Sequence, residues 1–286
     1  MMRVLVLTAS LLLLTACAGN VPRDLQSGQK TIAVLSFVGS KYSSLENTRP
    51  SNTSIQQRID QVNAALPTLD ARDIDYDDFY AGSQEKRWNH DVTDWGVDRY
   101  AVEAVRARLA KKYRVVDFAY DPADFDYRGQ HAAFVHESAA EIGNAIKRQA
   151  GYAGAKNIDA YVILLPAVQD FTILDRPSQG IGMIRDFLAF APGQQIGDGV
   201  YMLHALYNVA VFDGRTLDFL AVQVARSDTL YQNRFRGNPA VFVDNSYWSA
   251  SYEQLSNAKR DKIVTEVEGM IDDTLPGTLS EIGLLP

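Results

Sequence analysis

The chain alternates short apolar runs with polar segments, a pattern typical of buried strands and amphipathic helices. Runs rich in β-branched and apolar residues, bounded by turn residues, predict strands. These strands are expected at residues 31–38, 113–118, 160–168, 201–212 and 217–226. The segment Asp213-Gly214-Arg215-Thr216 predicts a hairpin turn between the last two of them.

Apolar residues spaced three and four apart predict amphipathic helices. These helices are expected at residues 55–66, 94–112, 138–153 and from Ser249 or Ser251 to about Pro276. Asp94 is the expected N-cap of the second helix, and Ser138 has the capping-box spacing to Glu141. Pro276 is expected to end the last helix.

The resulting order of elements is β, α, α, β, α, β, β, β, α. Interleaved strands and helices predict an α/β (α+β) domain, here a three-layer-like domain built on a single mixed sheet. Residues 31–286 contain no segment with linker composition and are therefore expected to form this one domain. The polar and turn-rich residues at about 40–93 and 171–199 are predicted to be long insertions.

The N-terminus has the layout of a secretory signal peptide. Arg3 supplies a positive charge, and the apolar run from Val4 to Leu14 is too short to span a bilayer as a stable helix. The run ends in Leu14-Thr15-Ala16-Cys17, which resembles the lipobox of bacterial lipoproteins. The only cysteine of the chain falls at the position of the cysteine that this motif modifies.

The lipobox resemblance implies a signal peptide at residues 1–16 and a membrane lipid anchor on acylated Cys17. Two or more acyl chains make such an anchor stable. Ala18 follows the cysteine, which by resemblance to enterobacterial sorting rules implies the periplasmic face of the outer membrane. Residues 17–30 are expected to be the lipidated cysteine and a flexible tether, because those after Cys17 are small and polar.

Composition and charge exclude several classes of function. The 286 residues include 28 Lys and Arg against 35 Asp and Glu, which gives a formal net charge of −7. Without a basic excess, nucleic acid is not expected as a partner. A single cysteine excludes an intramolecular disulfide framework and any multi-cysteine metal site.

No metal site or cofactor is predicted from the remaining polar residues. Asp73, Asp75 and Asp77 resemble the start of a calcium loop, but Asp78 and Gln84 occupy the positions where the EF-hand needs Gly and Glu. A solvated acidic loop is therefore favoured over a casual calcium site. The four histidines match no zinc motif, and His204 is expected to be a hydrogen-bonded, partly buried histidine in a strand.

Catalytic motifs are absent from the sequence. There is no Walker loop, no nucleophile elbow and no dinucleotide fingerprint, so no catalytic residue is assigned. Carboxylates are plentiful, however, and a catalytic pair among them is not excluded by the sequence. A lipid-anchored hydrolase therefore stays open as an alternative function.

Two segments have the composition of contact surfaces. Ile181, Ile184, Phe187 and Leu188 share one face if residues 181–191 are helical, and would contact a partner or the membrane interface. The competing interpretation, that they cover the core, is favoured because apolar loop residues are normally buried. A second, aromatic segment suits a protein interface or, more commonly, core filling; it comprises Tyr231, Arg234, Phe235, Arg236, Phe242, Tyr247, Trp248 and Tyr252.

The order of elements resembles a group of bacterial envelope proteins. The group includes the N-terminal domain of TolB, the curli-secretion channel lipoprotein CsgG and the penicillin-binding-protein activator lipoprotein LpoB. The matching pieces are Ile32–Phe37, Tyr113–Val116, Ala155–Leu164 and Phe212–Thr216, with Ser36 where the group usually has proline. The resemblance implies a TolB-like fold and a binding or assembly module.

The sequence therefore predicts a non-catalytic lipoprotein of the outer membrane that binds or scaffolds envelope proteins from the periplasmic side. The alternatives are a subunit of an oligomeric secretion assembly, by similarity to CsgG, and the lipid-anchored hydrolase. The identity of the envelope partner does not follow from the sequence.

Overall fold

The computed structural model describes residues 20–27, 29–48, 84–122, 125, 132–152, 157–171, 176–186, 199–226 and 239–286, and the single residues 57, 60, 61 and 64. It has the predicted α+β class, but it contains two five-stranded mixed sheets and a two-stranded hairpin, so the expectation of a single sheet is wrong. The proposed signal peptide, Cys17 and the acidic segment 70–78 lie outside the described residues.

The first sheet, sheet A, has the strand order β11-β10-β5-β1-β4. Its strands are β1 (Thr31–Ser36), β4 (Arg114–Val116), β5 (Ala160–Pro166), β10 (Tyr207–Asp213) and β11 (Phe219–Val224). Strand β1 pairs in parallel with β4 and β5, while β10 pairs antiparallel with β5 and β11. The β10–β11 turn confirms the predicted hairpin, and Asp213 closes it by accepting hydrogen bonds from the backbone amides of Arg215 and Thr216.

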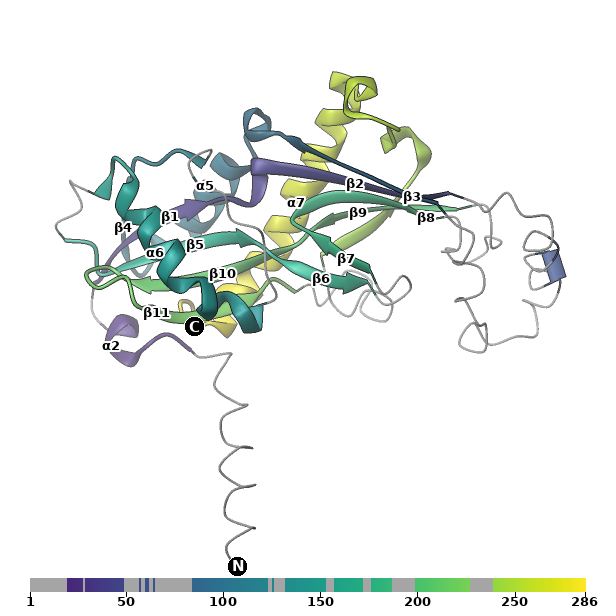
Figure 1. The fold of residues 1–286 in the computed structure, drawn as a ribbon. Helices are drawn as coiled ribbons and strands as arrows, with labels where there is room; N and C mark the ends of the chain where they lie inside the picture. Colours follow the sequence, from purple (N-terminus) through teal and green to yellow (C-terminus); the bar gives the residue numbers. More distant parts are fainter. Residues whose placement is uncertain are drawn as a thin grey trace, which may run out of the picture.

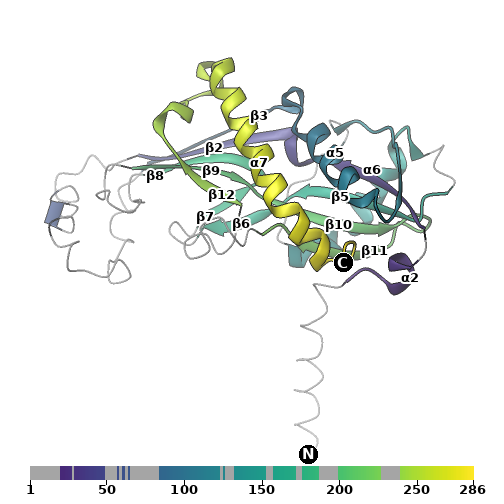
Figure 2. The same cartoon turned by 180° about the vertical axis from the view of Figure 1, so that it is seen from behind.

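Helices cover both faces of sheet A (Figures 1 and 2). They are α5 (Val97–Leu109) and α7 (Asn257–Glu281) on one face and α6 (Ala139–Arg148) on the other. Side chains alternate along β1, so Ile32 and Val34 pack toward α5 and α7, whereas Ala33 and Leu35 pack toward α6. A strand buried on both faces is a nearly continuous apolar run, which is why β1 and β5 were recognisable in the sequence.

The second sheet, sheet B, was not predicted. Its order is β12-β9-β8-β2-β3, and its strands are β2 (Lys41–Thr48), β3 (Gln84–Asp91), β8 (Ile181–Asp186), β9 (Val200–Ala205) and β12 (Ala240–Val243). Both supposed insertions contribute to it, since β2 and β3 come from 40–93 and β8 from 171–199. A small hairpin of β6 (Val168–Phe171) and β7 (Arg176–Gln179) precedes β8.

The apolar run predicted as one strand at 201–212 is two strands in different sheets. Strand β9 belongs to sheet B and β10 to sheet A, and only Leu206 separates them. Both strands are buried, so the run stays apolar where the chain changes sheets.

The ends of the helices differ from the predictions in two places. Helix α5 follows Gly96, whose φ is +79°, and Asp94 lies in a preceding 3-10 helix instead of capping α5. Helix α7 starts after Ser256, whose hydroxyl accepts a hydrogen bond from the amide of Lys259, and it continues through Pro276 to Glu281. Within the part of the chain that the structure describes, no helix is both long enough and apolar enough to cross a membrane.

The described residues after the proposed anchor, 20–27, 29 and 30, include two that pack into the core, where a flexible tether was expected. Val21 and Leu25, the latter in the short helix α2 (Arg23–Gln26), are buried in the core beside α7. The amide of Val21 donates to the carbonyl of Ile282 over 3.0 Å, next to the C-terminus. The prediction failed because the apolar residues are only two, too few to form a pattern, and their burial depends on the C-terminal segment.

Candidate functional site

The two sheets meet where the chain crosses from one to the other. Leu206 alone separates β9 of sheet B from β10 of sheet A. Ala167 separates β5 of sheet A from the β6–β7 hairpin, and Gly180 separates that hairpin from β8 of sheet B. The backbones of these three residues form a closed ring of hydrogen bonds: Ala167 N donates to Leu206 O, Leu206 N to Gly180 O, and Gly180 N to Ala167 O, at 2.9–3.0 Å. The ring satisfies buried peptide groups that neither sheet pairs, and it ties the sheets together.

Gly180 is the residue of this ring that only glycine suits. Its φ is +59°, and a Cβ there would lie 3.3 Å from the Cβ of Pro166. Its carbonyl also accepts a hydrogen bond from Nδ1 of His204 over 2.9 Å. Because a carbonyl can only accept, the proton of the imidazole lies on Nδ1.

His204 is a core residue. It is 1% exposed, and burial lowers its pKa to about 4, so the ring is neutral near pH 7. The predicted hydrogen bond of a histidine in a strand is confirmed, but His204 is fully buried where partial burial was expected. His204 is therefore a structural support of the sheet junction.

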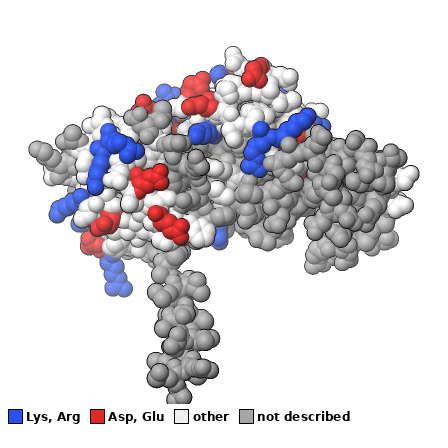
Figure 3. All heavy atoms as spheres, viewed as in Figure 1, with Lys and Arg blue, Asp and Glu red and all other residues white. Residues whose placement is uncertain are grey.

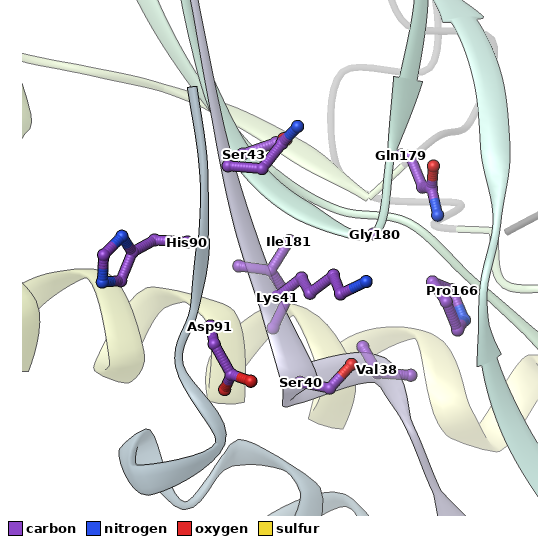
Figure 4. Close-up of a pocket in the computed structure, with 11 residues that line it drawn as sticks. Val38, Ser40, Lys41, Ser43, His90, Asp91, Pro166, Gln179, Gly180 and Ile181 are labelled. Atoms are coloured by element: carbon purple, nitrogen blue, oxygen red, sulfur yellow. The ribbon is translucent and has the colours of Figure 1, made fainter. Parts of the chain in front are cut away.

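A cavity of about 310 Å³ opens beside Gly180, at the carboxyl ends of β1 and β5 (Figure 4). In α/β sheets ligands bind at this edge, where neighbouring strands connect in opposite directions. Here β1 leads through the 3-10 helix η1 (Val38–Ser40) to β2, and β5 leads to the β6–β7 hairpin. The polar residues of the lining are Ser40, Lys41, Ser43, Asn89, His90, Asp91 and Gln179.

The charged residues of the cavity face each other across two strands. Lys41 and Asp91 are register partners in the β2–β3 pair, so their side chains share one face of sheet B. Asp91 accepts hydrogen bonds from the amide and hydroxyl of Thr93, and these bonds, with the nearby charge of Lys41, lower the pKa of Asp91. The cavity thus presents a carboxylate and an ammonium group at pH 7.

The close-up separates the groups that face the cavity from those that do not. In Figure 4 the side chain of Lys41 extends toward Gly180 and Gln179, whereas the ring of His90 points away. That ring stacks on Tyr252, with ring centroids 3.4 Å apart. His90 is therefore not placed to act as a base on a molecule in the cavity.

A buried polar cluster fixes η1, which forms one wall of the cavity. Asp98 of α5 accepts hydrogen bonds from Oγ of Ser36 (2.7 Å) and from the amide of Gly39 (2.9 Å). The hydroxyl of Tyr120 accepts from the amide of Ser36 (3.0 Å) and donates to its carbonyl (3.2 Å). A proline at position 36, as the resemblance would have it, has no amide to donate and would lose the first of these two bonds.

Asp98 is held in an unfavourable environment for a carboxylate. It is 5% exposed, and its Oδ2 has no hydrogen-bond partner. Burial raises its pKa to about 6 even though Ser36 and Gly39 donate to it. A Cβ on Gly39 would lie 2.8 Å from the Cβ of Val97, so η1 approaches the start of α5 as closely as glycine allows.

The predicted contact residues on 181–191 are not on a surface helix. Ile181 and Ile184 lie in strand β8 and are 1% and 2% exposed, so the helical prediction is wrong and neither residue is available to a partner or a membrane. They fill the core, as the competing interpretation held. Phe187 and Leu188 lie outside the described residues, as do Leu14, Thr15, Ala16 and Cys17.

The aromatic segment is partly core as well. Phe242, Tyr247, Trp248 and Tyr252 are partly buried and pack against the hydrophobic core. This supports the core-filling interpretation for these four. The other four members of that segment, residues 231 and 234–236, lie outside the described residues.

Sequence reasoning singled out no residue of the cavity as a binding residue. Lys41, Ser43, Asn89 and Asp91 lie in segments predicted as loops, and Gln179 lies in a predicted insertion. The only apolar residues of β2 are Tyr42 and Leu45, which are three positions apart and therefore on opposite faces, too weak a signal for a strand. Only strand pairing brings these residues together.

The chemistry of the cavity suits binding. It offers amide, hydroxyl, carboxylate and ammonium groups above the apolar side chains of Val38 and Pro166. Among the residues that the structure describes, no three His, Cys, Asp or Glu side chains lie close enough to hold a metal ion. Comparison with models of known protein families and with curated proteins gives no match to this chain.

Proposed function

We propose that the chain is an outer-membrane lipoprotein, anchored by acyl chains on Cys17, whose periplasmic domain binds another envelope protein and catalyses no reaction. The observation that carries the anchor is Leu14-Thr15-Ala16-Cys17, with the only cysteine of the chain at its end. The fold supports this anchor because Val21, only four residues after Cys17, is already packed in the core of the domain.

The binding role is supported by the cavity at the sheet junction. Its polar groups lie on paired strands and on η1, which Asp98 holds in place, so they are preorganised. Amide and hydroxyl groups recognise peptide bonds, and the Lys41–Asp91 pair complements a charged side chain or terminus. A polypeptide segment of the partner is therefore the proposed occupant.

The anchor is tested by growing cells with an alkyne-bearing fatty acid and measuring its incorporation into the protein. The wild-type protein is expected to incorporate the label and to fractionate with the outer membrane. Cys17→Ser lacks the thiol and is expected to carry none. Equal labelling of both proteins would overturn the assignment of Cys17 as the modified residue.

The binding role is tested by photocrosslinking in cells. A photoreactive amino acid replaces Asn89 at the cavity, and the control carries it at the exposed Glu137 near α6. We expect one envelope protein to crosslink from position 89 and not from 137, as identified by mass spectrometry. Self-multiples from position 89 would instead support the oligomeric-assembly alternative, and no adduct from 89 would contradict binding at the cavity.

A further inference from the structure

The first described residues hold the domain close to the proposed anchor. Val21 is four residues after Cys17, and it is 2% exposed. Besides its bond to Ile282, its carbonyl accepts a hydrogen bond from Nε2 of Gln26 over 2.9 Å. Leu25 is buried in the same core, so the chain is fixed to the domain from Val21 onward.

A tether of this length leaves little freedom. Four residues span at most about 14 Å even when fully extended. A folded chain of this size has a radius of gyration of roughly 19 Å. The tether is therefore shorter than the radius of the domain that it carries. The surface around Val21 must stay near the lipid headgroups.

The surface around Val21 is formed by three segments in direct contact. Besides the bond from Val21 to Ile282, the amide of Arg114 donates to the carbonyl of Lys30 (2.9 Å), and Nζ of Lys112 donates to the carbonyl of Leu284 (3.3 Å). We name this surface, made of residues 20–27, 29, 30, 110–114 and 282–286, the anchor face. Figures 1 and 2 both show α2 beside the C-terminal end of the chain.

The anchor face is basic in an acidic protein. Its three segments contain five Lys and Arg side chains and one acidic side chain, that of Asp24, whereas the whole chain has a net charge of −7. The basic residues are Arg23, Lys30, Lys111, Lys112 and Arg114. On the face of the molecule seen in Figure 3, by contrast, acidic and basic side chains are interspersed.

We propose that the anchor face lies directly on an anionic lipid surface, with its lysines and arginines against the phosphate headgroups. The proposal rests on the acylation of Cys17 given above. The short tether brings the face to the bilayer, and the local positive charge holds it there, because basic residues near an anionic surface are attracted within a Debye length.

The two ends of helix α7 can be used to measure this orientation. Its C-terminal end adjoins the anchor face at Ile282, and its 25 residues correspond to about 37 Å of helix. Asn257 at its other end is exposed and stands away from the bilayer. The proposal therefore predicts that the C-terminal end of α7 lies near the lipid headgroups and that its N-terminal end lies in water.

The test uses the acylated full-length mature protein, reconstituted into phosphatidylcholine vesicles containing phosphatidylglycerol. Since the only native cysteine is acylated, Ser27→Cys on the anchor face and Asn257→Cys can each be labelled with a fluorophore. A nitroxide on the lipid headgroup is the quencher. We expect quenching at position 27 and none at 257; equal quenching at both positions would overturn the proposal.

The charges are tested with a spacer of Gly and Ser residues inserted between Gly19 and Asn20, which removes the constraint of the short tether. With the spacer, quenching at position 27 is expected to persist in the native sequence and to be lost in Lys111→Glu/Arg114→Glu. The matched control is Lys147→Glu/Arg148→Glu, on exposed residues of α6, and should keep the quenching. Equal quenching in both double variants would refute the role of the charges.

These outcomes are separable from failure of the proposed function. Flotation of the protein with vesicles and its intact mass report acylation alone. A protein that is not acylated overturns the function and this proposal together. A protein that is acylated and floats, but whose position 27 is not quenched, leaves the lipoprotein assignment in place and overturns the orientation.

Discussion

The guanidinium group of Arg108 donates a hydrogen bond to the main-chain carbonyl of Asp272 over 3.3 Å. This carbonyl is the one that Pro276 leaves without a helical partner, because proline has no amide hydrogen to donate four residues back. Arg108 also forms an ion pair with the Asp272 carboxylate at 3.0 Å, to which Tyr100 donates as well. Arg108 of helix α5 thus supplies the hydrogen-bond donor that Pro276 lacks, which explains why α7 continues beyond the proline.

Replacing Arg108 with Ala should therefore destabilise the protein by about 1–3 kcal/mol, the usual worth of hydrogen bonds that involve a charged group. The cost should be smaller in a Pro276→Ala background, where the helix supplies its own donor to Asp272. Urea unfolding of both single variants and the double variant measures this coupling. An identical loss of unfolding free energy for Arg108→Ala in both backgrounds would refute the role of Arg108 as the substitute donor.

Gly180→Ala is expected to destabilise the sheet junction by about 1–2 kcal/mol, because alanine at φ +59° is strained and its Cβ would press on Pro166. The matched control is Gly277→Ala in α7, where a Cβ meets nothing within 4 Å. Alanine there should stabilise by about 0.5–1 kcal/mol. Thermal unfolding distinguishes the two, and shifts of the same sign would contradict the role of Gly180.

The buried imidazole of His204 should make the protein less stable in acid. Its pKa falls to about 4 in the folded state, so the unfolded chain binds the proton first as the pH drops below the ordinary value of 6.5. Stability is then lost between pH 6.5 and 4, by up to about 3 kcal/mol from this group. His204→Asn keeps a donor near Gly180 but does not titrate there. Its unfolding free energy should fall less over that range, and parallel pH profiles would argue against the assignment.

Asp98 should contribute with the opposite sign. Its pKa is raised from 3.8 to about 6, so the folded state favours the protonated acid, and stability present below pH 3.8 is lost as the pH rises through 6. The loss is about 3 kcal/mol at most, by the conversion of pKa shifts to free energy. Asp98→Asn still accepts from Ser36 and Gly39 but stays neutral. Relative to the wild type it should gain stability between pH 4 and 7, as measured by urea unfolding. A constant difference across that range would contradict this.

The elements that sequence patterns predicted well share one property. Strands β1 and β5 and helices α5 and α6 bury apolar residues at regular spacing against their immediate neighbours, and β1 and β5 are buried on both faces. Periodicity reports burial, so these elements were recognisable. The ends of helices were harder to predict. Helix α7 continues beyond Pro276 because Arg108 of α5 donates a hydrogen bond to the carbonyl of Asp272.

Strands β2 and β3 had no such signal. Strand β2 buries the polar Ser44 and Asn47 as well as Tyr42 and Leu45, so its buried positions form no apolar pattern. The two strands also depend on pairing of β2 with β8, more than a hundred residues later. The cavity could not be predicted for the same reason. Lys41 and Asp91 meet Gln179 only after this pairing, and each looks like an ordinary surface residue in the sequence.

By itself, then, the sequence determined the α+β class, most elements of sheet A with their covering helices, and the lipobox-like motif that motivates the anchor. The tertiary structure alone decided the second sheet, the ring of Ala167, Gly180 and Leu206, and the packing of Val21 against the C-terminus. The physical reason is that local patterns record which residues are buried. Hydrogen bonds between distant segments depend on partners that no local pattern identifies.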